Sequence, residues 1–308
     1  MYRPTNKLAF TAEDKTDANR FWTRMVPTPE GMTKAVVHYI SCAMPEATQV
    51  TIDKYPVAPL KSNDTLRVIV IAGNLSKFAG DAGDIILAHL LSSWDFIVYV
   101  PGPYEYAHST IEMGDDYSKV MGSVDHRFIV LGTGENMTRC VHFLGPQLVL
   151  IGAPLWPLEP ELYKTIKVFE ESSSQTTAQG ATRAVEEGRF VRASMLKFRM
   201  MRDVRDLIKT LNGRMNDKET RIVVSYGCPT PLISSNICMA RTIRSYDGTV
   251  NIKEMDQIAP RIDRWIYGAN GDDGAIHKVG NVFYHRNQYT LRHQSFETPN
   301  PITVVPKK

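Results

Sequence analysis

The positions at which catalytic or metal-binding residues are expected follow directly after an apolar segment of the sequence. In FIVYVPGPYEYAHS (96–109), an apolar and β-branched run ends at Pro101 and Gly102. Such a run before a Pro-Gly stop predicts a buried strand that ends in a functional loop. The loop then offers Pro103 and Tyr104, where metal chemistry needs a nitrogen or oxygen ligand. The stretch therefore has the backbone pattern of an active-site loop without its side chains.

Four further stretches have the same form, an apolar run followed by small or polar residues. In α/β sheets, ligands bind at the carboxyl ends of the strands, so we expect these stretches to converge on one edge. They are HYISCAMPEA (38–47), VIAGNLSKFAGD (70–81), VVSYGCPTP (223–231) and DRWIYGANGD (263–272).

The elements that must position these loops follow from the hydrophobic pattern. Near-continuous apolar strands imply that both faces of a sheet are covered, which places helices outside. The sequence therefore predicts an α/β or mixed α+β protein with a large sheet core. Helical spacing predicts a helix over 81–94 and a long one over 183–212. The predicted strands are 34–40, 67–73, 96–100, 127–131, 141–144, 147–153, 221–227 and 281–287.

In chain order, the five strand-end stretches resemble the motifs of the calcineurin-like metallophosphoesterase family, which read roughly YISDLHLE, LAGDI, YVPGNHEYY, VTHHAP and WIHGHTH. VHFLGPQLVLIGAPLW (141–156) and GNVFYHRNQY (280–289) extend the resemblance over about residues 34–290. The resemblance implies a four-layer sandwich of two mixed β-sheets flanked by helices. It also implies two divalent metal ions, held by Asp, His and Asn, that activate a bridging water and stabilise charge on a phosphate.

The side chains at the metal and leaving-group positions of the motifs have all changed, although scaffold residues such as Gly102 and Glu105 remain. Cysteine and methionine are soft ligands, proline offers no useful ligand, and one neutral amide does not hold two dications. The sequence therefore predicts no catalytic residue, no metal and no cofactor. The vestigial metal-site positions are Cys42, Met44, Asn74, Pro103, Tyr104, Tyr226, Gly227, Tyr267, Ala269 and Gly271.

Two replacement sites remain open on the sequence alone. His108, His277 and Asp272 lie near the third and fifth motif loops. Cys42 and Cys228 come from loops that meet in the family's fold, where they could hold a soft metal or form a disulfide. No histidine pair has HxH or HxxxH spacing, and four cysteines in 308 residues favour reduced thiols in an intracellular setting.

Composition and local bias predict the organisation of the chain. A 43% hydrophobic and 22% charged sequence with net charge +3 is ordinary for a globular protein. No apolar run approaches the roughly 20 residues of a membrane span, so we expect an intracellular protein, soluble or within an assembled particle, without a membrane partner.

We expect an N-terminal arm over 1–33, a metallophosphoesterase-like domain over 34–295 with a mobile insertion near 171–182, and a C-terminal tail over 296–308.

The long predicted helix is rich in basic residues. A solvated helix face is the ordinary interpretation of this pattern, and a contact with nucleic acid or an acidic protein is the alternative. The candidate basic interaction face is Arg189, Arg192, Lys197, Arg199, Arg202, Arg205 and Lys209.

These observations favour a catalytically inactive metallophosphoesterase-like protein that acts as a structural or binding component of a larger assembly, through protein partners. An atypical metal-dependent phosphoesterase with an altered active site is the main alternative. A third hypothesis is a nucleic-acid-associated assembly subunit that uses the basic helix.

Overall fold

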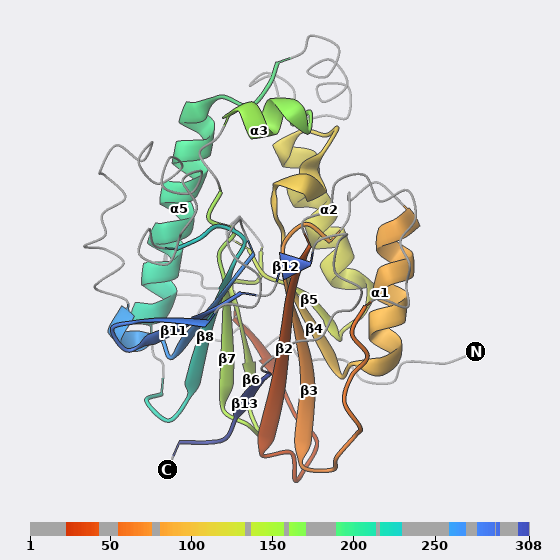
Figure 1. Ribbon diagram of the computed structural model, residues 1–308, viewed down its shortest axis with the longest axis vertical. Coiled ribbons are helices and arrows are strands. Elements are labelled where there is room, and N and C mark those ends of the chain that lie inside the picture. The colour runs from red at the N-terminus through yellow and green to blue at the C-terminus, as the bar shows by residue number, and fades with distance from the viewer. Residues whose placement is uncertain are drawn as a thin grey trace, which may run out of the picture.

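Two mixed β-sheets with helices on their outer sides form the centre of the protein, in the computed structural model shown in Figure 1. This arrangement confirms the α/β class that the apolar runs predicted. No described helix has the length and apolar character that crossing a membrane requires. The structure describes residues 23–42, 55–75, 81–132, 137–156, 160–170, 189–213, 216–229, 259–268, 276–286, 288–289 and 301–307.

The first sheet is six-stranded, in the order β12-β2-β3-β4-β5, with β13 also paired to β2. Strands β2, β3, β4 and β5 are parallel, whereas β13 runs antiparallel to β2. The bounds are β2 (Lys34–Cys42), β3 (Thr65–Ala72), β4 (Phe96–Val100), β5 (Phe128–Val130), β12 (Gln288–Tyr289) and β13 (Ile302–Val304).

The second sheet is seven-stranded, in the order β1-β6-β7-β8-β9-β11-β10. Strands β7, β8, β9 and β11 are parallel, and the antiparallel pairs β6–β7 and β10–β11 lie on either side of β8 and β9. The bounds are β1 (Thr23–Val26), β6 (Cys140–Phe143), β7 (Leu148–Gly152), β8 (Thr220–Ser225), β9 (Arg264–Tyr267), β10 (Ile276–Val279) and β11 (Val282–His285).

The two sheets pack face to face over one apolar core. Val68 and Val70 of β3 lie in the same cluster as Leu150 of β7 and as Ile222 and Val224 of β8. These side chains are two residues apart along their strands, which is the spacing that points successive members to one face of a sheet. The inner faces of both sheets are therefore closed by each other, as the continuous apolar runs required.

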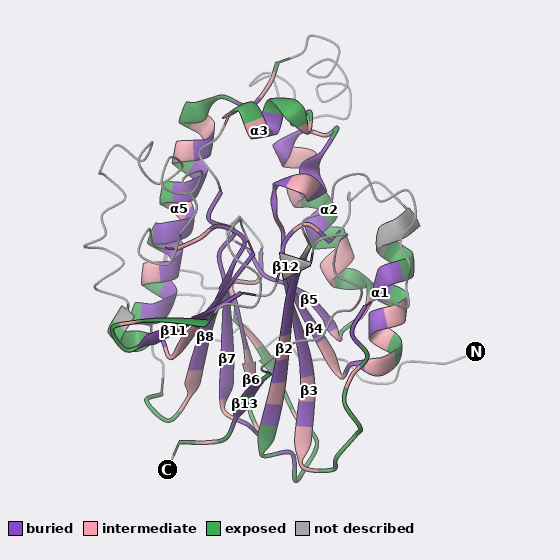
Figure 2. Ribbon diagram, viewed as in Figure 1, coloured by how far each residue is buried: buried purple, intermediate pink, exposed green. Residues whose placement is uncertain are grey.

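Helices cover the outer faces (Figures 1 and 2). On the six-stranded sheet, Ile69 and Ile71 of β3 pack with Ile86 of α1 (Asp81–Ser93). On the seven-stranded sheet, Leu207 of α5 (Ala193–Asn212) packs with Val223 of β8. Alternate residues along each of these strands are thus buried on opposite faces of the sheet. The layers run helix, sheet, sheet, helix.

A cap lies beyond the carboxyl ends of the strands. It contains the 3-10 helix η2 (Pro103–Tyr106), the first turns of α2 (Ile111–Val124), α3 (Pro160–Thr165) and the first turns of α5. The ring centroid of Trp156 lies 4.7 Å from that of Tyr106 and 6.0 Å from that of Tyr163. This aromatic cluster joins the loop after β4 to the loop after β7, and so connects the two sheets.

The termini of the described chain depart from the expected arm and tail. Thr23–Val26, within the expected arm, forms β1, which pairs with β6 in parallel. Ile302–Val304, within the expected tail, pairs with β2. Both segments satisfy a sheet edge that would otherwise expose unpaired backbone groups. Residues 1–22 and the expected insertion at 171–182 lie outside the described residues.

The expected long helix begins later than the spacing predicted. Phe190 forms a β-bridge with Phe169, and α5 begins only at Ala193. The stacked rings of these two phenylalanines, with centroids 5.1 Å apart, hold the backbone extended at that point. Residues 183–188 lie outside the described residues, so the correction applies to 189–192.

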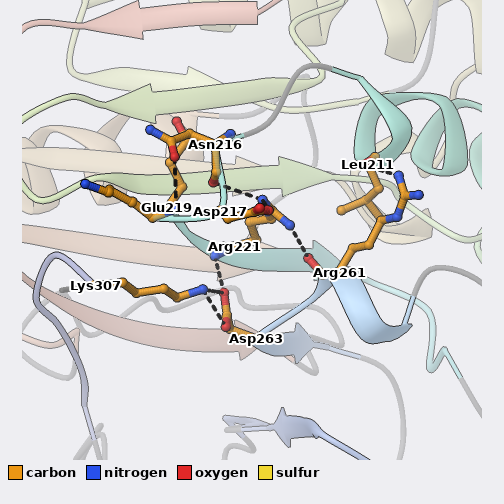
Figure 3. Close-up of polar contacts among 9 residues, drawn as sticks. Leu211, Asn216, Asp217, Glu219, Arg221, Arg261, Asp263 and Lys307 are labelled. Carbon is orange, nitrogen blue, oxygen red and sulfur yellow. Dashed lines mark hydrogen bonds and ion pairs between the residues drawn. The ribbon is translucent and has the colours of Figure 1, made fainter.

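A polar network holds the amino ends of β8 and β9, opposite the cap (Figure 3). The Asp263 carboxylate accepts a hydrogen bond from the backbone N–H of Arg221 at 2.8 Å and from Lys307 at 2.9 and 3.0 Å. Arg261 donates to the carbonyl of Leu211 at 3.2 Å, near the end of α5. The network therefore joins the chain after β13, two strands of the other sheet and the end of a helix.

We expect Asp263→Ala to lower the free energy of unfolding by about 1–3 kcal/mol, because it leaves the N–H of Arg221 without its acceptor. Lys307→Ala should cost less than about 1 kcal/mol, since the ion pair is solvent-exposed, with 40% of the Lys307 side chain and 35% of the Asp263 side chain accessible. Urea unfolding of both variants measures the difference. Equal losses would contradict the assignment of the stability to the buried amide.

Candidate functional site

The carboxyl ends of strands from both sheets meet at one edge. The hydroxyl of Ser41 on β2 donates to the carbonyl of Gly268, which follows β9, at 3.0 Å. The amide Nδ2 of Asn74, after β3, donates to the hydroxyl of Tyr226, after β8, at 3.1 Å. The convergence predicted from the strand-end stretches is confirmed for these described loops.

The ring of Tyr226 lies at the centre of this edge. A β-carbon on Gly73 would overlap its Cδ2, and a β-carbon on Gly102 would lie 2.6 Å from the same atom. Gly73 also has a φ of +81°, which favours glycine in its own right. The loops after β3 and β4 thus reach the Tyr226 ring because they present backbone without side chains there.

Asn74 connects three of the loops. Its Oδ1 accepts the backbone N–H of Tyr104 at 3.2 Å, while its Nδ2 donates to Tyr226. Its φ of +59° is one that asparagine tolerates better than most residues. The amide therefore uses both its acceptor and its donor group within the protein, as a structural bridge.

Glu105 holds the loops after β3 and β4 together from the interior of the protein. Its carboxylate accepts the backbone N–H of Leu75 at 2.5 Å and that of Gly102 at 2.8 Å, and only 1% of the residue is exposed. Burial raises the pKa of this carboxyl to about 7, against hydrogen bonds from Tyr99 and backbone amides that lower it. The sequence alone marks Glu105 as a scaffold residue, without a role of its own. Its position three residues after Gly102 has the spacing of a capping box, which could have identified it.

The loop after β8 is fixed by a second buried chain of hydrogen bonds. The indole N–H of Trp265 donates to the Ser225 hydroxyl at 2.8 Å, and that hydroxyl donates to the carbonyl of Gly227 at 2.7 Å. The N–H of Gly227 in turn donates to the carbonyl of Pro154 at 2.9 Å. These bonds fix the direction in which Tyr226 leaves the strand.

The structure brings together some of the predicted site positions and not others. Asn74, Tyr104 and Tyr226 are joined by hydrogen bonds, and Pro103 begins the η2 turn beside them. Tyr267 instead packs in the cluster under α5, on the outer face of its sheet. Met44, Ala269, Gly271 and the side chain of Cys42 lie outside the described residues, as does Asp272 of the alternative histidine site, so neither that site nor the pairing of Cys42 with Cys228 is tested.

The described residues do not fit the two divalent cations that the resemblance implies. Within them, no three His, Cys, Asp or Glu side chains lie close enough together to hold a metal ion. The amide oxygen of Asn74 is already an acceptor for Tyr104, and the Glu105 carboxylate is buried against two backbone amides. The ring of Tyr226 adds an apolar surface where hard oxygen ligands would be needed.

The candidate basic face loses one member. Arg199 was expected on it, but the residue is only 6% exposed, and its guanidinium donates to Asp115 of α2 at 2.8 Å. The guanidinium also lies 5.5 Å from the ring centroid of Trp156. Burial acts to lower the pKa of Arg199, but the pairing with Asp115 outweighs it and raises that pKa. Arg199 is therefore a buried tie between α5 and α2.

Comparisons with known proteins bear on the fold. No family model and no curated protein matches the chain. Among solved structures, the chain is similar to the crystal structure of phosphopantetheinyl hydrolase (PptH) from Mycobacterium tuberculosis, with a TM-score of 0.53 and 10% sequence identity, over 90% of this chain and 98% of that chain. At this identity, the similarity supports the two-sheet α/β fold and does not extend to activity.

We expect Glu105 to make stability depend on pH. Its folded-state pKa of about 7 lies above the ordinary 4.5, so the folded protein binds the proton more strongly than the unfolded chain does. Its contribution is full below pH 4.5 and is lost as the pH rises towards 7, by up to about 3 kcal/mol. Denaturant unfolding from pH 4 to 8, compared with Glu105→Gln, isolates this effect because the variant cannot titrate. A stability difference that stays constant over this range would contradict it.

Proposed function

We propose that this chain is a catalytically inactive member of the calcineurin-like metallophosphoesterase family that acts as a structural or binding component of a larger assembly. The order of the five strand-end motifs supports the family assignment. The two face-to-face sheets with outer helices are compatible with the family's four-layer sandwich. The similar solved structure is that of a phosphopantetheinyl hydrolase, which agrees with an enzyme-derived fold.

One observation carries the inactive part of the proposal, the contact of Tyr226 with the loops after β3 and β4. In the motif comparison, Tyr226, Asn74 and Tyr104 stand at a metal-binding histidine, the bridging aspartate and the phosphate-contacting histidine. Here their side chains and backbone bond to one another instead. Polar groups that hydrogen-bond to one another in this way are not available as ligands for a metal ion.

The charge of the edge supports the same conclusion. Two dications bring four positive charges into one place, which carboxylates must partly neutralise. Asn74 is neutral, and Glu105 is buried behind the loops, where it accepts from Leu75 and Gly102. Tyr104 at the leaving-group position is a phenol with a pKa near about 10, a poor general acid at neutral pH.

A binding role needs surfaces outside this edge. The expected arm contributes Phe10, Phe21 and Trp22, apolar side chains of the kind that anchor protein interfaces. Met25, also within the expected arm, lies in β1 at the edge of the seven-stranded sheet and is 43% exposed. Protein partners in an assembly therefore remain part of the proposal.

We expect no metal-dependent hydrolysis of a chromogenic phosphodiester or phosphomonoester with manganese, nickel or zinc. Asn74→Asp should not create activity, because one carboxylate leaves a second ion without ligands. The measurement is release of nitrophenolate by the full chain, with Asn74→Ala as the matched control for contaminating phosphatase. Metal-dependent turnover by the wild-type chain that disappears in Asn74→Ala would instead establish the alternative, an atypical metal-dependent phosphoesterase.

A further inference from the structure

The side of α5 that does not pack on the sheet carries both apolar and basic residues, and parts of this helix are coloured as exposed in Figure 2. Phe198 is 63% exposed and Met201 is 53% exposed. Arg202, Arg205 and Lys209 follow at helical spacing from Phe198, so these residues share one side of the helix. We call Phe198, Met201, Arg202, Arg205 and Lys209 the α5 face.

The acidic residues of α5 do not neutralise this face, because both are buried. Asp203 is 0% exposed and accepts the backbone N–H of Leu155 at 2.9 Å. Asp206 is 4% exposed and pairs with Arg139 at 3.2 Å. The nearest approach to the face is 3.8 Å, from Asp206 to Arg205, whose side chain is 63% exposed. The outward side of α5 is therefore basic without an exposed acid.

Several arginines elsewhere in the described structure are paired with carboxylates. Arg67 bonds to Asp95 at 2.8 Å, Arg127 to Asp125 at 2.9 Å, and Arg192 to Glu170 at 2.8 Å. In contrast, Arg202 and Lys209 have no ion-pair partner in the part of the chain that the structure describes. The Nε of Arg202 is buried without a hydrogen-bond partner. The face thus keeps two cations, Arg202 and Lys209, without an ion pair among the described residues, next to the exposed ring of Phe198.

We propose that the α5 face binds single-stranded nucleic acid, with Arg202, Arg205 and Lys209 on phosphates and Phe198 stacked on a base. Arg202 and Lys209 are seven residues apart, which places the charges over about 10 Å along the helix axis. A row of cations beside an aromatic ring is the combination that binds single strands without sequence preference. This inference is independent of the proposed loss of catalysis.

The packing of α5 argues against a membrane surface as the ligand. The opposite side of the helix is committed to the seven-stranded sheet through Val204, Leu207 and Leu211. Only Phe198 and Met201 of the face are apolar, so little apolar area is available to enter a bilayer. A polyanion that needs charge and one stacking surface fits the face better.

The test is fluorescence anisotropy of the full chain with labelled oligo(dT) and oligo(U) of about 20 nucleotides. With about three phosphate contacts, we expect the affinity to fall about 20-fold between about 50 and 200 mM salt. Arg202→Gln/Arg205→Gln/Lys209→Gln should abolish most of this salt dependence. Phe198→Ala should lower the affinity about fivefold or more and leave the salt dependence unchanged.

The matched control is Lys61→Gln/Lys164→Gln/Lys218→Gln, which removes the same charge from exposed residues on other elements. It should bind like the wild type. The proposal is overturned by absence of oligonucleotide binding at low salt, by an equal loss in the control, or by insensitivity to Phe198→Ala. Preferential binding to phosphatidylserine vesicles or to polyglutamate would also overturn it. Thermal melting verifies the fold, and Phe198→Ala tests the proposal independently of the triple variant.

Discussion

The close approach of the two sheets at their carboxyl ends is the constraint on which the rest of the structure depends. Both sheets share one apolar core, so the loops that follow β3, β4 and β8 are brought to the same edge. The ring of Tyr226 fits there only because Gly73 and Gly102 carry no β-carbon. Once the ring is in place, it packs against both glycines and accepts a hydrogen bond from Asn74, and no cluster of metal-ligating side chains is found among the described residues.

The buried polar groups beneath that edge keep the loops in position. Glu105 satisfies two backbone amides, and Ser225 relays a hydrogen bond from Trp265 to the carbonyl of Gly227. Each bond offsets the cost of burying a polar group, which would otherwise oppose folding of the loops. Backbone amides and glycines therefore hold the loops at this edge in position.

The helix α5 divides its charged residues between two roles. Arg199, Asp203 and Asp206 are buried and hold the helix to α2, to the loop after β7 and to Arg139. Arg205 and Lys209 are exposed and Arg202 is half-buried, and these three residues have no comparable role. Counting the basic residues of the helix does not distinguish these two groups. Their burial does, because the buried residues make contacts that stabilise the cap, whereas the exposed ones are available to a ligand.

The sequence by itself determined the class of fold and most of the central strands, because a strand covered on both faces must be apolar throughout, as in 67–73 and 147–153. It also determined which loops follow those strands, and it predicts that their side chains are unsuited to hard metals. The tertiary structure alone decided the rest. The short strands β1 and β13 form only by pairing with distant partners, and α2 contains Gly114, which packs against Tyr106 and dilutes the helical pattern. Arg199 is buried because Asp115, 84 residues away, is brought beside it. Likewise, the position of the Tyr226 ring is set by two glycines on the other sheet, since contacts between segments far apart in the chain leave no local pattern in the sequence.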